Sequence, residues 1–183
     1  MCGKSHIRLG QYLLAKYMPD LPGHYRQAFL IGCIEPDRNP ATYVKGSIRY
    51  QWLRGHNYNN AKRFMSRISR RLERKKRLKL FDYYTLGKLI HYTADSFTFA
   101  HNDVFSDTLS GHRKYEAKLQ KHFINYLRKA PSFHIENRYS IMDAISEYHK
   151  QYSREVPAID MDCWYTLQAC CCVLAVLLMP KIN

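Results

Sequence analysis

The most constraining stretch of this sequence is residues 83–102, YYTLGKLIHYTADSFTFAHN, which would be apolar on almost every side of a helix. Such a helix belongs in the centre of a fold, because a surface helix keeps one polar face. The stretch nevertheless contains His91 and Asp95, and His101 follows where the helix is expected to end. A buried carboxylate without a partner is costly to remove from water. The sequence therefore predicts a central helix whose Asp95 is compensated by a bound metal ion.

Two acid and histidine pairs occur at helical spacing, namely His91 with Asp95 and His112 with Glu116. Side chains four residues apart on a helix are offset by only about 40°, so each pair can offer two ligands to one metal. The spacing alone is weak evidence. A buried salt bridge between Asp95 and Lys88, or a core histidine held by hydrogen bonds, explains part of the pattern without a metal. We favour the metal because three suitable groups converge at the end of a mostly apolar helix.

The remaining hydrophobic pattern predicts an all-α fold. No stretch alternates with period two over six or more residues. We expect a single domain over residues 1–183, because this length suits one hydrophobic core. The helix over residues 24–34 is expected to end at Glu35-Pro36, because proline disfavours helix for the residue before it; Asp37 would then lie on a loop. The other expected helices cover residues 6–17, 59–79, 112–129 and 140–153, and a last apolar helix follows Pro157.

The helix expected at 59–79 is amphipathic and strongly basic. The chain carries 29 Lys and Arg against 15 Asp and Glu, a formal charge of +14, and residues 62–79 supply ten of the basic side chains. A concentrated positive field favours an anionic partner, such as a phospholipid surface, a nucleic acid or a phosphate ester. A solvated helix face with no partner is the alternative. We expect any membrane or nucleic-acid contact to be peripheral and to use residues 62–79.

The cysteines and the two ends of the chain indicate a reducing compartment. The six cysteines include three in a row, 170–172, which fit neither paired zinc-knuckle spacing nor a disulfide ladder. We expect them to be small core residues. The N-terminus lacks the apolar segment of a secretory signal, so a cytoplasmic location is expected. The apolar run 167–179 has 13 residues, too few to cross a bilayer of about 30 Å, and predicts a buried helix with no transmembrane segment.

Five segments in order resemble the zinc-dependent phospholipase C family, whose wider superfamily includes zinc-dependent single-strand nucleases. They are HIRLG at residue 6, IEPD at 34, RGH at 54, LGKLIHYTADSFTFAHN at 86 and GHRKYE at 111. The resemblance spans residues 6–116, about 60% of the chain. Its most specific parts are His-Tyr-x-x-Asp with a histidine six residues later, and then His-x-x-Tyr-Glu.

The resemblance implies a polynuclear zinc site among the helices, with two or three ions. One Zn²⁺ would be held by Asp37, His56, His91 and Asp95, and a second by His101, His112 and Glu116. Asp95 would bridge to a third ion that also uses His6. The family completes this third site with the N-terminal amine and carbonyl of a processed chain, placed further ahead of the first histidine than Met1 lies ahead of His6. The amine of residue 1 or 2, or the Cys2 thiol, takes that role here, or the third site is incomplete.

The resemblance also implies hydrolysis of a phosphodiester, with Asp37 orienting or deprotonating the attacking water. Histidine nitrogen and carboxylate oxygen both suit Zn²⁺, and paired ions can clamp the attacking and leaving oxygens of a phosphodiester. A phospholipase C-like activity on phospholipid or related phosphoesters is expected. The alternatives are a zinc-dependent nuclease-like phosphodiesterase and a non-catalytic protein with structural zinc. Against the last, structural zinc sites usually have closed, cysteine-rich shells, which none of the six cysteines fits.

Four further histidines, at positions 24, 122, 134 and 149, match no part of this pattern and are expected to be surface or structural residues. Tyr92, Phe99 and Tyr115 lie near the candidate ligands. Aromatic side chains at helical spacing are more often core than site residues.

Overall fold

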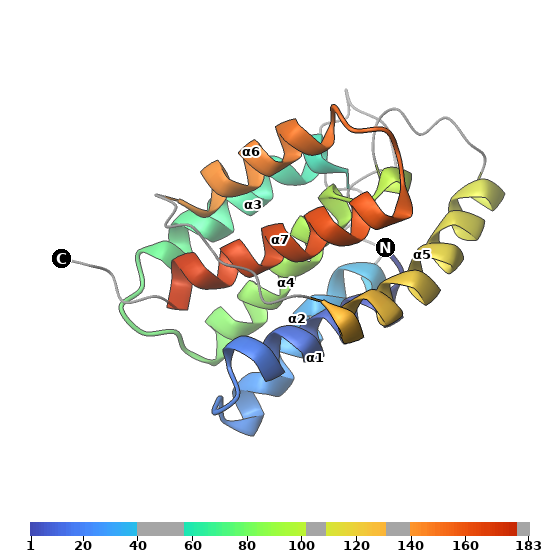
Figure 1. The fold of residues 1–183 in the computed structure, drawn as a ribbon. Coiled ribbons are helices and arrows are strands. Elements are labelled where there is room, and N and C mark those ends of the chain that lie inside the picture. The colour runs from blue at the N-terminus through green and yellow to red at the C-terminus, as the bar shows by residue number, and fades with distance from the viewer. Residues whose placement is uncertain (40–56, 102–108, 131–139, 179–183) are drawn as a thin grey trace.

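Figure 1 shows the computed structural model of the chain, which describes residues 1–39, 57–101, 109–130 and 140–178. Every regular element within these ranges is a helix, so the all-α prediction is confirmed. The seven α-helices and one short 3₁₀ helix (η2) are α1 (Gly3–Tyr17), α2 (Gly23–Arg38), α3 (Tyr58–Glu73), α4 (Leu80–Ser96), η2 (Phe99–His101), α5 (Leu109–Lys129), α6 (Ile141–Tyr152) and α7 (Ile159–Leu178).

Helix α4 is the central element, as its composition predicted. It packs against α1, α2, α3 and α7, and from Leu89 to Ser96 every residue is buried. Its first turn is fixed by Asp82, whose carboxylate accepts a hydrogen bond from the Lys79 backbone N–H at 3.0 Å. This contact satisfies one of the amides that a helix N-terminus leaves without an intrahelical partner.

Helices α2 and α4 run side by side in the same direction and touch through their backbones (Figure 1). Two glycines make this approach possible. A Cβ built on Gly32 would lie 2.1 Å from the carbonyl oxygen of Tyr84, and one on Gly87 would lie 2.1 Å from that of Phe29. Real Cβ atoms do not come this close, so neither position has room for a side chain. The close contact brings Cys33 and the end of α2 against the ligand-bearing half of α4.

The prediction that α2 ends before Pro36 was wrong. The helix continues to Arg38, so Asp37 lies in its last turn and not on a loop. Proline lacks one helical donor, but its φ is that of a helix, and the chain here goes on for only one more turn. That turn is closed by the Asn39 N–H, which donates to the Glu35 carbonyl at 3.0 Å. Asp37 is therefore held by a helix end, which restricts its side chain more than a loop would.

The basic helix was predicted too long. Helix α3 ends at Glu73 and not near Lys79, and α4 begins at Leu80. The four residues Lys75, Lys76, Arg77 and Lys79 lie in the connection, where repulsion between neighbouring cations is relieved by solvent. The Asp82 carboxylate, buried at the start of α4, lies 3.4 Å from Arg71 and 3.5 Å from Lys75 and so holds both ends of the connection together.

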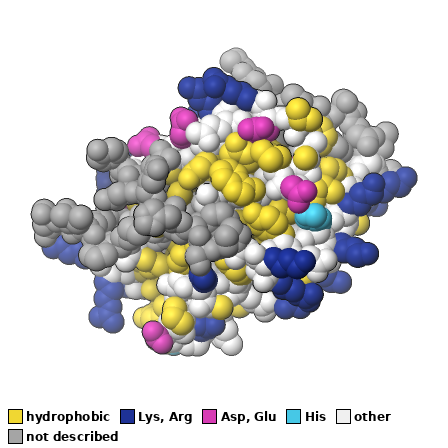
Figure 2. Space-filling model, viewed as in Figure 1, with side chains coloured by type: hydrophobic (Ala, Val, Ile, Leu, Met, Phe, Trp, Pro, Cys, Tyr) yellow, Lys and Arg dark blue, Asp and Glu magenta, His cyan; other side chains and the backbone are white. Residues whose placement is uncertain are grey.

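Helix α7 is longer than the 13-residue apolar run indicated. It begins at Ile159, so its first turn includes Asp160 and Asp162. It is the one helix in the described ranges that is long and apolar enough to cross a membrane, and 67% of its most apolar window is buried inside the protein. Five cysteines are buried and all six are free thiols, as expected for small core residues; Cys2 is half-buried. Figure 2 shows hydrophobic side chains across the middle of the face over α7, with Lys and Arg mostly around its edge.

One end of the bundle collects four chain segments that are distant in sequence. The start of α1, the ends of α2 and α4, and the first half of α5 meet there (Figure 1). Because helices are rigid, each segment presents only the side chains of a turn or two at this end. All of the candidate ligands that the structure describes come from these turns or, for His101, from η2 just beyond α4.

We expect Gly87→Ala to destabilise the protein by about 1–3 kcal/mol, the usual effect of forcing extra atoms into a packed contact. Alanine is otherwise the better helix former, so the sign of the change reports the contact with α2. Urea unfolding followed by circular dichroism measures it. Gly23→Ala is the matched control, because a Cβ at Gly23 meets nothing within 4 Å. Equal stability of the two variants would contradict the backbone contact.

Candidate metal centre

The first cluster of candidate ligands, group one, consists of His6, Asp37, His91 and Asp95. One ligand atom from each lies within 4.8 Å of the others. His6 comes from the first turns of α1, Asp37 from the last turn of α2, and the other two from the second half of α4. His6, His91 and Asp95 have no exposed side-chain surface, whereas 21% of the Asp37 side chain is exposed. Asp37 is thus the member of the group that reaches solvent.

The two oxygens of Asp95 face different histidines. Oδ2 lies 3.2 Å from His91 Nε2, and Oδ1 lies 3.2 Å from His6 Nε2. The two imidazole rings are stacked with their centroids 3.9 Å apart, so their Nε2 atoms point the same way, toward the carboxylates. Asp37 repeats the pattern less tightly, with Oδ1 at 3.6 Å from His91 Nε2 and Oδ2 at 4.0 Å from His6 Nε2. This is the arrangement of a carboxylate able to bridge two cations.

The tautomer of His91 suits metal binding. Its Nδ1 lies 2.9 Å from the carbonyl oxygen of Cys33, which can only accept, so Nδ1 carries the proton. Nε2 is then the ring nitrogen that faces the carboxylates and is left to coordinate an ion bound between them. A histidine ligand is usually fixed in this manner by a hydrogen bond from its other nitrogen. The alternative of a salt bridge between Asp95 and Lys88 does not apply, because Lys88 pairs with Glu35 at 2.6 Å.

The second cluster, group two, consists of His101, His112 and Glu116. His101 lies in η2, just beyond α4, and the other two are one turn apart on α5. Glu116 Oε1 lies 3.3 Å from His101 Nε2 and 3.5 Å from His112 Nε2. The exposed fractions of these side chains are 12% for His101, 27% for His112 and 19% for Glu116. Group two is therefore more open than group one.

The two groups adjoin each other through Asp95 and His101, whose Oδ1 and Nε2 atoms are 3.9 Å apart. The α-amino group of Met1 lies between them. It donates to Asp95 Oδ1 at 2.7 Å, and lies 2.7 Å from His101 Nε2 and 3.0 Å from Glu116 Oε1. The Cys2 thiol instead donates to Gln120 at 2.9 Å. Of the groups that the sequence suggested for completing a third site, the Met1 amine is thus the one beside Asp95.

The pKa shifts in the cluster follow from burial and from these contacts. Burial and the adjacent His91 lower the pKa of His6 to about 4, so its ring is neutral and can act as a ligand at pH 7. Burial would raise the pKa of Asp95, but the Met1 amine and the surrounding histidines hold it well below its usual range. Burial likewise opposes ionisation of Glu116, yet hydrogen bonds from His101 and His112 lower its pKa. Both carboxylates are therefore anionic.

The donor spacings fit Zn²⁺. Two ligand atoms that each lie about 2.1 Å from a tetrahedral zinc are about 3.4 Å apart. The contacts of Asp95 with His6 and His91, and of Glu116 with His101 and His112, are 3.2–3.5 Å. Neither ring nitrogen of His6 makes a hydrogen bond within the described part of the chain, although the ring is fully buried. A cation bound beside Asp95 would give the Nε2 atom of His6 a partner.

The structure brings together seven of the eight residues that the resemblance to the family assigned as ligands, and His56 lies outside the described residues. His6 shares a cluster with Asp37 and His91, so the first and third ions of the predicted arrangement would be neighbours. That these side chains bind metal stays a prediction. Of the other histidines, His24 is exposed, His122 pairs with Asp160 at 2.6 Å and His149 stacks on Tyr58, while residue 134 lies outside the described ranges.

One residue that supports the centre was missed in the sequence. Asp162 of α7 is fully buried, and its Oδ2 accepts hydrogen bonds from the Phe99 N–H at 2.9 Å and the Tyr115 hydroxyl at 2.7 Å. Its Oδ1 accepts from the Tyr152 hydroxyl at 2.6 Å. Phe99 is two residues before His101, and Tyr115 is next to Glu116. The sequence signal that could have identified Asp162 is an acidic residue in the first turn of an apolar helix. Such a residue is ordinarily explained by its favourable interaction with the helix dipole.

We expect Asp162→Ala to weaken zinc binding by about 10- to 100-fold, the usual effect of losing a group that orients metal ligands. Without the carboxylate, η2 and α5 lose the link that fixes His101 relative to Glu116. Competition with a chromophoric chelator measures the affinity. Asp160→Ala is the control, because the Asp160 side chain is 79% exposed. Asp162→Asn keeps one acceptor oxygen and should lose less; affinity within about twofold of wild type in Asp162→Ala would contradict this role.

Comparison with protein-family models gives a match over residues 5–159 to the family described as zinc-dependent phospholipase C. The matched range contains both groups and ends just before the turn that carries Asp162. The comparisons with curated proteins and with solved structures gave no significant match. The family match covers well over half of the chain and agrees with the resemblance seen in the five sequence segments. The chain belongs to the zinc-dependent phospholipase C family, a family of hydrolases.

Proposed function

We propose that the protein is a zinc-dependent phosphodiesterase that acts on phospholipid or related phosphoesters. The observation that carries this proposal is the contrast between the two ligand groups, with a buried group one beside a solvent-accessible group two. A structural zinc site closes its shell, whereas a catalytic site keeps a position open for water or substrate. The half-exposed donors of group two support the catalytic reading over a purely structural one.

The surroundings of each residue indicate its role in the proposed reaction. Zinc bound here would supply a Lewis acid for the phosphate oxygens and lower the pKa of a water molecule. The buried carboxylate of Asp95 would hold positive charge at the centre, and its anionic state is favoured by the neighbouring amine and imidazoles. His91 is oriented by the Cys33 carbonyl, so its Nε2 need not reorganise when a ligand arrives.

Asp37 is the best candidate for the general base. It is held at the end of α2, it reaches solvent, and its carboxylate lies within 4.0 Å of both imidazoles of group one. A base must be within hydrogen-bond reach of the proton that it takes, directly or through one water. The partly exposed carboxylate is suited to orient a water at the edge of the cluster and to accept its proton.

We expect the purified protein to contain zinc and to hydrolyse at least one phosphodiester from a panel of phosphatidylcholine, a chromogenic phosphorylcholine ester, bis-p-nitrophenyl phosphate and single-stranded DNA. Dialysis against a chelator should abolish the activity, and added Zn²⁺ should restore it. Cleavage of the phosphocholine substrates with DNA left intact supports the phospholipase reading, and the reverse supports a nuclease-like enzyme. Absence of zinc together with no chelator-sensitive hydrolysis would refute the proposal.

Asp37→Asn provides the residue-level control for the same assay. It removes the proton acceptor and keeps the shape, so kcat should fall by about 10²- to 10⁴-fold, the range for general bases. Zinc content is measured in parallel, because Asp37 is also a candidate ligand. Asp20→Asn, an exposed carboxylate between α1 and α2, should leave both values unchanged. Full activity in a zinc-loaded Asp37→Asn protein would remove Asp37 from the mechanism.

We further propose that the basic segment 62–79 lies against an anionic lipid surface. Nine of its ten Lys and Arg side chains are exposed, with Lys75 half-buried. Its single acid, Glu73, is engaged by the Ile141 N–H at 2.6 Å. Beside these cations, the side chains of Leu80 and Phe81 are 50% and 58% exposed. Exposed apolar side chains next to a basic face are typical of surfaces that bind a membrane interface.

Replacing four arginines of the basic segment 62–79 with glutamine should weaken binding to phosphatidylserine-containing vesicles by at least about tenfold, since each cation near such a surface contributes about 1 kcal/mol. Sedimentation with vesicles measures it, and pure phosphatidylcholine vesicles should show little binding. The variant carries Arg63→Gln, Arg67→Gln, Arg70→Gln and Arg74→Gln. A charge-matched control carries Lys118→Gln, Lys121→Gln, Lys129→Gln and Lys150→Gln, all exposed elsewhere. Equal losses in the two variants would indicate a nonspecific charge effect and contradict a dedicated surface.

A further inference from the structure

A cavity lies along the contact between α1 and α5, and its lining includes none of the candidate metal ligands. Its volume is about 340 Å³, at the lower end of the range for small-molecule pockets. Residues Arg8, Gln11 and Tyr12 line it from α1, and Ile124, Leu127 and Arg128 line it from α5. Glu116 and Ile124 are eight residues apart on α5, which corresponds to about 12 Å along the helix axis.

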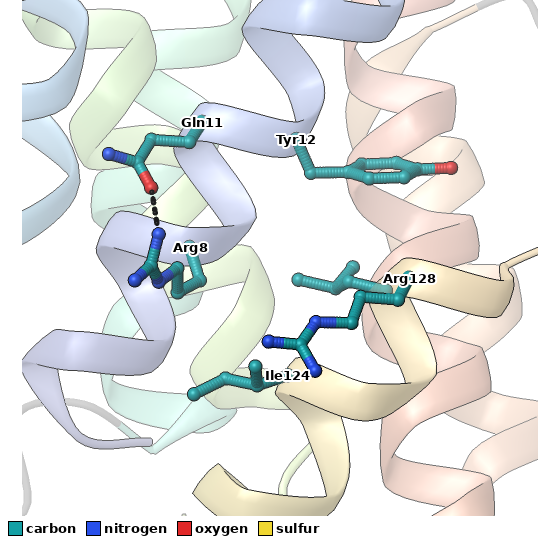
Figure 3. A pocket seen from close by; sticks show the side chains of 6 residues that line it. Arg8, Gln11, Tyr12, Ile124 and Arg128 are labelled. Carbon is teal, nitrogen blue, oxygen red and sulfur yellow. Dashed lines mark hydrogen bonds between the residues drawn. The ribbon is translucent and has the colours of Figure 1, made fainter.

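Among the residues that the structure describes, the charged side chains of the lining are both cationic, and no aspartate or glutamate contributes to it. Figure 3 shows the guanidinium of Arg128 extending from α5 toward α1, where the Arg8 guanidinium donates to Gln11 Oε1 at 3.1 Å. In the described part of the chain neither arginine forms an ion pair, and the contact of Arg128 is with Asn125 at 3.5 Å. Both arginines are exposed, so water weakens the repulsion between their charges, and an anion bound between them would be attracted to both.

Apart from the two arginines and Gln11, the described lining is mostly apolar. Leu127 is buried, and Ile124 and Tyr12 are half-buried, so they form a wall beside the two arginines. A small inorganic anion would leave the apolar side chains of this wall in contact with water. A ligand with an oxyanion head and a short hydrocarbon portion would satisfy the guanidinium groups and cover the wall. Arginine suits such a head because its planar fork matches carboxylate and phosphate oxygens.

We propose that this cavity binds an amphipathic anion, with a phosphate or carboxylate head between Arg8 and Arg128 and an alkyl portion along Tyr12, Ile124 and Leu127. The site is separate from the phosphodiesterase proposal and would stand if no hydrolysis were found. A lipid-derived monoester and a free phosphate share the head-group chemistry, and they differ in whether the apolar wall contributes to binding.

Isothermal titration of the zinc-loaded full chain with octyl phosphate, octanoate and inorganic phosphate tests the proposal. Octyl phosphate should bind at least about tenfold more tightly than inorganic phosphate. The double variant Arg8→Gln/Arg128→Gln should weaken octyl phosphate by at least about tenfold, because it removes two charge-assisted contacts. The control Lys118→Gln/Lys121→Gln removes two exposed charges from α5 and should leave the affinity unchanged. Zinc content and circular dichroism should be the same in all three proteins.

Three results would overturn the proposal. The first is equal octyl phosphate affinity in the wild type and in Arg8→Gln/Arg128→Gln. The second is an equal loss in the control, which shows a general effect of charge. The third is binding that disappears on chelation in every protein, which places the anion at the metal centre. Phosphate binding that depends on the two arginines but is not improved by the alkyl chain would overturn the amphipathic ligand in favour of a simple anion site.

Discussion

The buried carboxylate of Asp95 is the constraint on which the rest of the centre depends. Removing an ionised carboxylate from water costs several kcal/mol even after relaxation, and Lys88, the lysine of α4, pairs with Glu35 instead. The compensating groups are three imidazoles, on α1, on α4 and on the turn after α4, together with the Met1 amine just ahead of α1. Each of these groups reaches Asp95 only because the end of a helix lies beside it. The fold therefore places four segments around one negative charge.

Close helix packing makes that arrangement possible. Gly32 and Gly87 let α2 and α4 touch, and the carbonyl of Cys33 can then reach His91 Nδ1. With larger residues the helices would separate, and the hydrogen bond that sets the His91 tautomer would be lost. The same approach carries Asp37 to the edge of the cluster. A packing feature with no chemistry of its own thus orients the ring of one candidate ligand and sets the position of another.

The sequence predicted the helical class and the central place of α4, because hydrophobic periodicity depends on neighbours one or two turns apart. It located the pairs His91 with Asp95 and His112 with Glu116 for the same reason. The prediction failed where a local sequence preference is overridden by tertiary packing. At Pro36 the end of α2 is packed against its neighbours, and it therefore tolerates the backbone N–H donor that proline lacks. Asp162 could not be recognised, because its three partners lie 10, 47 and 63 residues away and only the folded chain brings them together.

The different exposure of the two groups follows from where their residues lie on the helices. Group one draws on the buried second half of α4, the buried face of α1 and the last turn of α2, so three of its four donors have no exposed side-chain surface. Group two draws on a 3₁₀ turn and the first half of α5, at the margin of the bundle, where Asp162 must supply the rigidity that burial supplies elsewhere. A fixed group beside an open one satisfies two opposed requirements of hydrolysis. The donors must not reorganise during the reaction, yet the phosphodiester must still be able to enter and its products leave.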